Sequence, residues 1–160
     1  MPSEKSRYLN KDCVPSAPLN FTELKQNLPS FGIKRLVEIL WMSSQRDHVL
    51  RKALMVSVGI QLADGNLEKA KAAIDYALHF PDYIRYNDRG YGLILSEIRV
   101  TLECLEDKIN KEFVLSVAQY AFELGQVVSE NFEDDWDWIS DLEDLEHWIQ
   151  RNKSQFNAED

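Results

Sequence analysis

Residues 62–78 read LADGNLEKAKAAIDYAL, and this stretch decides the fold class. Gly65 and Asn66 supply a tight turn, because glycine accepts left-handed backbone and asparagine is a favoured residue at the start of a helix. After the turn, small or apolar side chains recur three and four residues apart, at Ala70, Ala73, Ile74, Ala77 and Leu78. This spacing places them on one face of a helix, where a neighbouring helix can approach closely. The stretch therefore predicts the turn and second helix of an antiparallel helix pair.

Similar helical spacing continues on both sides of this stretch. Candidate helices cover residues 22–28, 32–44, 48–63, 66–79, 91–106, 111–130 and 137–152. Asp47 and Asn66 stand where N-capping residues are expected. The segment 32–44 is apolar around much of its circumference, so we expect this helix to lie centrally.

No segment shows the strict alternation of a half-buried strand over more than a few residues. The sequence therefore predicts an all-α fold, with six or seven helices in stacked antiparallel pairs. Residues 1–20 contain three prolines and no apolar period, which is typical of a loosely ordered leader. We expect one helical domain over residues 21–153 and a polar tail over 154–160, because 160 residues suffice for one ordinary domain.

The charge is distributed unevenly. The net charge of −9 divides into +4 over residues 1–61, −4 over 62–129 and −9 over 130–160. An acidic chain repels nucleic acid and anionic lipid, so we expect neither nucleic acid nor a membrane as partner. The expected partner is a protein, and its surface is expected to be basic.

The two cysteines, Cys13 and Cys104, show neither metal-ligand nor disulfide-framework spacing. Reduced thiols are typical of the cytoplasm, where we expect the protein to be located.

An acidic segment with aromatic residues is the main candidate site. Residues 130–146 hold nine acidic residues and no basic one, and Trp136 and Trp138 lie among them. Acidic and aromatic side chains together suit a basic, partly apolar protein partner. The predicted contact residues here are Glu133, Asp134, Asp135, Trp136, Asp137 and Trp148.

The same segment has a second interpretation. Trp138, Leu142, Leu145 and Ile149 fall at helical spacing, so they can form the buried stripe of a terminal helix whose acidic residues are solvated. Both interpretations stay open at this stage.

Two further groups of side chains have a functional and a structural interpretation. Tyr83 and Tyr86 lie beside Arg85 in a segment rich in turn residues, and they are either a second contact surface or part of the packing. A basic cluster lies around the first long helices, at Lys34, Arg35, Arg46, Arg51 and Lys52. It is either a solvated surface or the complement of the acidic end, within one chain or between copies.

Catalytic patterns are weak. His48, His79 and His147 fall on separate predicted helices, and no glycine-rich phosphate loop is present. The acidic residues of 133–144 fit part of a calcium-loop count, but Trp138 occupies the position of the turn glycine. We therefore expect no enzyme activity, no catalytic residue, no metal and no cofactor.

Five short pieces of the chain have the order and spacing of a known family. They are RDHVLR at 46–51, AID at 73–75, LECLE at 102–106, AQYA at 118–121 and DDWD at 134–137. Together they resemble the helical domain that accompanies SWIM zinc fingers in bacterial proteins. The zinc finger itself is absent, and Trp138 replaces the glycine usual after the last piece. The resemblance implies a helical scaffold and no catalytic residues.

A second likeness covers a single helix pair. Gly65, Ala70, Ile74, Ala77 and Leu78 are similar to the second half of a tetratricopeptide motif. Arrays of that kind need about three repeats, and one unit is visible here.

These patterns favour non-catalytic protein binding, by an adaptor or an accessory subunit. The alternative is an acidic antagonist, an immunity-type protein that caps a basic toxin or nuclease through charge complementarity.

The acidic segment leads to a mutational prediction. Replacing Trp136→Ala, Asp134→Asn and Asp135→Asn together should weaken partner binding and leave folding nearly intact, because contact residues are not part of the core. Binding and thermal melting of the triple variant check this expectation. An unfolded variant would mean that the segment belongs to the core and the helix cap.

Overall fold

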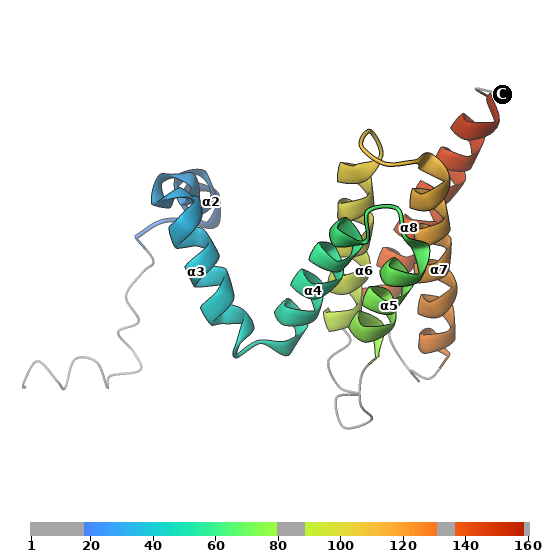
Figure 1. Cartoon of the computed structure of the whole chain (residues 1–160). Helices are drawn as coiled ribbons and strands as arrows, with labels where there is room; N and C mark the ends of the chain where they lie inside the picture. The colour runs from blue at the N-terminus through green and yellow to red at the C-terminus, as the bar shows by residue number, and fades with distance from the viewer. Residues whose placement is uncertain (1–17, 80–88, 131–136, 159–160) are drawn as a thin grey trace, which may run out of the picture. The chain divides into compact units, whose positions relative to one another are not determined.

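The computed structural model describes residues 18–79, 89–130 and 137–158, and these form helices and no strands (Figure 1). This confirms the all-α prediction. The elements are α2 (Phe21–Asn27), the 3-10 helix η1 (Leu28–Phe31), α3 (Gly32–Ser44), α4 (His48–Ala63), α5 (Leu67–Leu78), α6 (Arg89–Leu105), α7 (Lys111–Ser129) and α8 (Asp137–Ala158).

The chain divides into two compact units, residues 1–42 and residues 43–160. The prediction of one helical domain over residues 21–153 did not include a boundary after residue 42. In the first unit, α2 packs against η1, whereas α3 packs against neither. Ser44 is the one buried residue of α3, and the apolar side chains of the helix are largely exposed, as at Ile33 and Trp41. The expectation that this helix lies centrally is therefore wrong, since no element of its own unit covers it.

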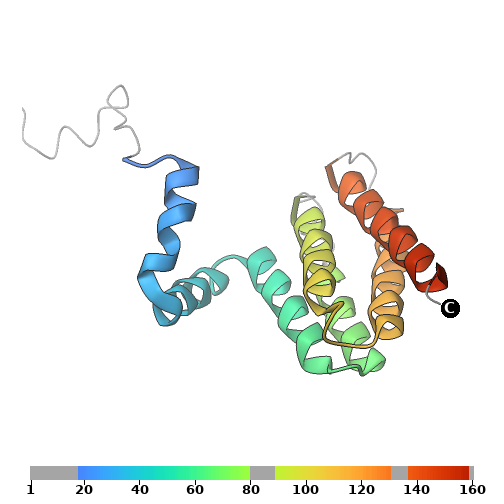
Figure 2. The ribbon, with the colours of Figure 1, turned by 90° about the horizontal axis from the view of Figure 1, so that it is seen from above.

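The second unit consists of two rows of helices. In one row, α6 packs between α4 and α8; in the other, α5 packs against α7. The rows are joined where α4 packs on α5 and where α7 packs on both α6 and α8 (Figures 1 and 2). A single core lies between the rows, and its fully buried large side chains include Ile60, Ile74, Ile94, Ile98, Leu102, Leu145 and Ile149.

The turn between α4 and α5 has the predicted form. Asp64 and Gly65 adopt positive φ angles of 48° and 83°. The Asn66 side chain then accepts a hydrogen bond of 3.1 Å from the Lys69 amide, which caps α5. These local preferences reverse the chain within a few residues and place α5 against α4.

The two helices approach closely at one point. A Cβ atom added at Gly59 would lie 2.7 Å from the Cβ of Ala73, which is too close for two carbon atoms. Gly59 on α4 and Ala73 on α5 therefore set the distance between the helices. Ala73 belongs to the small-residue face predicted from the sequence.

Basic side chains stabilise the end of this pair at which α4 begins and α5 ends. Lys52 donates hydrogen bonds from α4 to the carbonyl oxygens of Tyr76, at 2.8 Å, and His79 at the end of α5. Arg51 donates to the carbonyls of Ser44 and Gln45, each at 2.9 Å. Two members of the basic cluster thus satisfy helix-end carbonyls, which is a favourable place for a cation. Asp47 caps α4 as predicted, accepting from the amides of residues 49 and 50.

A tyrosine joins the end of α5 to the start of α6. Tyr91 is buried, and its hydroxyl donates a 2.6 Å hydrogen bond to the carbonyl oxygen of Leu78. Burial raises the pKa of the Tyr91 hydroxyl, so the group keeps its proton and remains a donor.

Helix α8 is longer than predicted. It continues to Ala158, so residues 154–158 of the expected polar tail are helical. Side chains in this part support the backbone, since Asn152 donates to the Trp148 carbonyl and Ser154 to the Gln150 carbonyl. No glycine or proline stands in residues 150–158 to end the helix earlier.

The contact at Gly59 leads to a test of the α4–α5 packing. Gly59→Ala gains about 1 kcal/mol of helix propensity. We nevertheless expect a lower melting temperature, because overpacking costs typically 1–3 kcal/mol. Adding Ala73→Gly should recover part of the loss by removing the opposing methyl group.

Thermal or denaturant unfolding of both single variants and the double variant checks this prediction. Strictly additive effects would mean that the two residues do not limit the helix distance.

Candidate functional site

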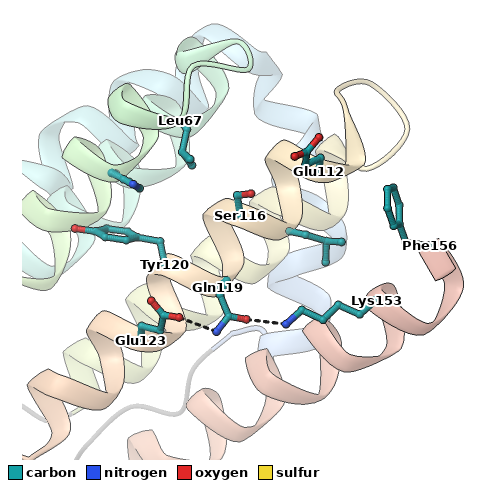
Figure 3. Close-up of a pocket in the computed structure, with 10 residues that line it drawn as sticks. Leu67, Glu112, Ser116, Gln119, Tyr120, Glu123, Lys153 and Phe156 are labelled. Carbon is teal, nitrogen blue, oxygen red and sulfur yellow. Dashed lines mark hydrogen bonds between the residues drawn. The ribbon is translucent and has the colours of Figure 1, made fainter.

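An open groove of about 630 Å³ lies along α7, between α5 and α8 (Figure 3). Ten side chains line it, from three helices: Leu67 and Lys71 of α5, Glu112, Leu115, Ser116, Gln119, Tyr120 and Glu123 of α7, and Lys153 and Phe156 of α8. Its volume lies in the range of about 300–1,000 Å³ that is usual for ligand sites.

Helix α7 has two different faces, and the groove lies on one of them. Glu112, Leu115, Gln119 and Glu123 recur three and four residues apart on the groove face. The opposite face is apolar and buried, at Phe113, Val114, Val117, Ala118 and Ala121. The core packing of the second face therefore fixes the direction in which the groove side chains project.

A chain of hydrogen bonds crosses from α8 to α7. Lys153 donates from Nζ to Oε1 of Gln119 at 3.0 Å. Gln119 in turn donates from Nε2 to Oε1 of Glu123, also at 3.0 Å (Figure 3). The amide of Gln119 is thereby oriented by a cation on one side and a carboxylate on the other.

Tyr120 occupies the side of the groove that faces α5. Its hydroxyl donates a hydrogen bond to Oδ1 of Asp75, and Nζ of Lys71 lies 5.3 Å from the centre of its ring. The bond to Asp75, partial burial and the charges of Asp75 and Glu68 raise the pKa of Tyr120 to about 12. The hydroxyl is thus neutral at physiological pH.

The lining combines binding groups of three kinds. Leu67, Leu115 and Phe156 are apolar, and Phe156 is 39% exposed. Lys71 and Lys153 are cationic. The remaining polar residues add two carboxylates, two hydroxyls and an amide. Such a surface can hold an apolar group of a ligand while hydrogen bonds fix its orientation.

Most of the predicted contact residues lie outside the described residues. This applies to Tyr83 and Tyr86 and to Glu133, Asp134, Asp135 and Trp136. Asp137 begins α8, and its side chain is outside the description as well.

Trp148 requires a correction. It is 3% exposed and belongs to the core cluster, so its side chain is not a free contact surface. The physical reason is helical geometry, because Trp148 follows Leu145 by three residues and so shares the buried face with Leu145 and Ile149. The predicted stripe of Trp138, Leu142, Leu145 and Ile149 did not include this position.

The described part of the acidic segment has a solvated face. Glu143, Asp144 and Glu146 are exposed, while Leu145 and Ile149 on the other side of α8 are buried. Partial burial and the charge of Asp144 raise the pKa of Asp141, although Arg99 acts in the opposite direction. Over residues 139–152, these features match the second interpretation of the segment, which is a terminal helix with one buried face and one solvated acidic face.

The sequence did not indicate the groove. Its lining residues span 67–156, and no short motif connects them. The polar partner of the Tyr120 hydroxyl lies on another helix, 45 residues away in the sequence. The one available signal was the mixed series at 112, 115, 119 and 123, on the face of α7 opposite its apolar stripe.

The described residues contain neither a cluster of metal-binding side chains nor a helix that could span a membrane. Over 18–79, 89–130 and 137–158, no group of three or more His, Cys, Asp or Glu side chains is placed to hold a metal ion. None of the helices in these ranges has the length and apolar character needed to cross a membrane.

No protein-family model matches the chain, and neither a curated protein nor a solved structure matches it. The resemblance to the helical domain that accompanies SWIM zinc fingers stays a prediction.

The raised pKa of Tyr120 predicts a change in stability at alkaline pH. An unfolded tyrosine loses its proton near pH 10, whereas folded Tyr120 holds its proton to about pH 12. Between these two pH values the folded state binds more protons than the unfolded state. The contribution of Tyr120 to stability is therefore fully present below pH 10 and is lost as the pH rises towards 12. Buried Tyr91 contributes with the same sign.

Tyr120→Phe should therefore lose less stability than the wild-type protein between pH 10 and about pH 12, the window set by the two pKa values. Denaturant unfolding at several pH values measures the difference, and Tyr76→Phe at an exposed position is the control. An unchanged slope for Tyr120→Phe would contradict the assignment.

Proposed function

We propose that the chain is a non-catalytic protein-binding helical domain, an adaptor or accessory subunit, whose groove along α7 receives a segment of another protein. One observation carries this proposal. Three helices bring apolar, cationic, anionic and amide side chains together along one open groove of about 630 Å³.

The length of the groove suits a polypeptide. Its lining residues on α7 extend from Glu112 to Glu123, which is roughly 17 Å at 1.5 Å per residue. An extended segment of about five residues, at roughly 3.3 Å each, has the same length. Helical segments with two or three exposed apolar side chains also suit a groove of this kind.

Apolar contacts are expected to supply most of the binding energy. Phe156 stands at the open edge, and aromatic side chains in such positions are common binding hot spots. Lys71 and Lys153 are balanced by Glu112 and Glu123 in the lining. Exposed ion pairs are worth about 0–1 kcal/mol each, so these charges orient a partner more than they hold it.

The acidic antagonist remains the second candidate, and it uses a different surface. The exposed carboxylates of α8 at Glu143, Asp144 and Glu146 are followed by no basic residue until Arg151. A basic toxin or nuclease would contact this face through charge. High salt would weaken such an association strongly.

Affinity capture from the native organism tests both candidates when three proteins are compared. They are the wild type, the groove variant Phe156→Glu and the control Val127→Glu, which changes an exposed side chain of α7 outside the groove lining. We expect one partner that is retained by the wild type and by Val127→Glu and lost with Phe156→Glu, because the new carboxylate would have to be buried against apolar groups.

The other outcomes are equally clear. A basic protein that binds all three proteins and is released only by high salt would support the antagonist and contradict the groove. Failure of the wild type to enrich any protein would contradict both candidates.

A further inference from the structure

On each of the three helices that form the groove, an apolar lining residue stands about one helical turn from a polar lining residue. These pairs are Leu67 and Lys71 on α5, Leu115 and Gln119 on α7, and Phe156 and Lys153 on α8. The polar members gather at one level of α7, because Lys153 donates to Gln119 and Lys71 lies over the ring of the next residue. The groove therefore has an apolar level and, about 6 Å further along α7, a polar level (Figure 3).

The side-chain amide of Gln119 has unused hydrogen-bonding capacity. A primary amide has two N–H donors and an oxygen that accepts two hydrogen bonds. One donor is used by Glu123 and one acceptor position by Lys153, each at 3.0 Å. One donor and one acceptor remain on this half-buried side chain in the lining of the groove. Because the two existing bonds fix the amide plane, the remaining groups point in a defined direction.

A donor and an acceptor side by side match the backbone of an extended polypeptide. Each residue other than proline carries one N–H and one C=O, and both need partners when they are buried. In an extended segment these groups are available to another molecule, whereas the interior residues of a helix have already paired them with each other. Charge does not select the ligand here, since two lysines and two glutamates of the lining balance.

The size of the groove also favours an extended segment. Glu112 and Glu123 at its two ends are roughly 17 Å apart along α7. An extended chain of this length, with a cross-section of about 4.8 Å by 10 Å, occupies roughly 800 Å³. A helix of the same length and about 10 Å in diameter occupies roughly 1,300 Å³. The groove volume of about 630 Å³ is closer to that of the extended chain.

We propose that the groove binds an extended segment of a partner protein, and that Gln119 forms two hydrogen bonds with the backbone of one of its residues. This inference rests on the proposed protein-binding function of the groove. Alternate side chains of an extended chain point the same way and are about 6.6 Å apart. An apolar side chain two residues from the one bound by Gln119 therefore reaches the level of Leu115 and Phe156.

The probe for the test is a heptapeptide selected on the wild-type chain from a random library of linear peptides. Selected peptides must lose binding to Phe156→Glu, which shows that they occupy the groove. Each backbone amide of the peptide is then replaced in turn by an ester, which removes the N–H and leaves the side chains unchanged. The affinity of each ester is measured by calorimetry for the wild type and for two variants.

The variants are Gln119→Leu and the matched control Gln126→Leu, which changes an exposed glutamine of α7 outside the groove lining. We expect one ester position to weaken binding about tenfold with the wild type and the control, since a backbone hydrogen bond is lost. The same ester should weaken binding less than about twofold with Gln119→Leu, which has already lost its side of the bond. Circular dichroism checks the helix content, and Gln119→Ala serves as a second variant that favours the helix.

The outcomes separate the two proposals. If no peptide is selected, or if the selected peptides bind Phe156→Glu as well as the wild type, the protein-binding groove is wrong and this inference is wrong with it. Peptides that need Phe156 but tolerate every ester would overturn the role of Gln119 alone. So would ester losses that are equal in the wild type and Gln119→Leu, as expected for a helical ligand whose internal hydrogen bonds the esters break.

Discussion

Helices α4 and α5 meet where Gly59 has no side chain and Ala73 has only a methyl group. This close contact determines how the second unit is built, because each helix of the pair begins one of its two rows. Helix α6 packs on α4, and α7 packs on α5. Helix α8 then closes the unit by packing on α6 and α7. A wider spacing between the first two helices would separate the rows and open the core between them.

The groove is a consequence of the same arrangement. Helix α7 is packed on one face by the core, and its other face is left between the neighbouring helices α5 and α8. The hydrogen bond from Lys153 to Gln119 connects α8 to α7 along this face. Side chains on rigid, well-packed helices hold their positions better than side chains on loops, which suits a surface that recognises a partner.

The sequence predicted those features that depend on short-range chemistry. The turn at Gly65, the caps at Asp47 and Asn66 and the small-residue face of α5 each follow from a few neighbouring residues. Contacts between residues far apart in the sequence could not be predicted from neighbouring residues. Nothing near Lys52 in the sequence shows that it reaches the carbonyls at the end of α5, 24 and 27 residues away.

Two interpretations failed for related reasons. An apolar helix needs cover, but its sequence does not say what provides it, and so α3 was wrongly expected to lie centrally. Trp148 was predicted to be a contact residue because it lies outside the predicted stripe of Trp138, Leu142, Leu145 and Ile149. The buried face of a helix is wide enough to include it, and its side chain is buried. The groove was missed because three distant helices contribute to it and none of them has a diagnostic motif.

The hydrogen bond from Tyr91 to the Leu78 carbonyl has a consequence for chain connectivity. Both groups lie at helix ends and are buried, so α5 and α6 are held together there independently of the peptide that links them. A protein cut between these two residues would consist of two fragments that share the core and recognise each other. This point is therefore suited to dividing the protein into complementing halves.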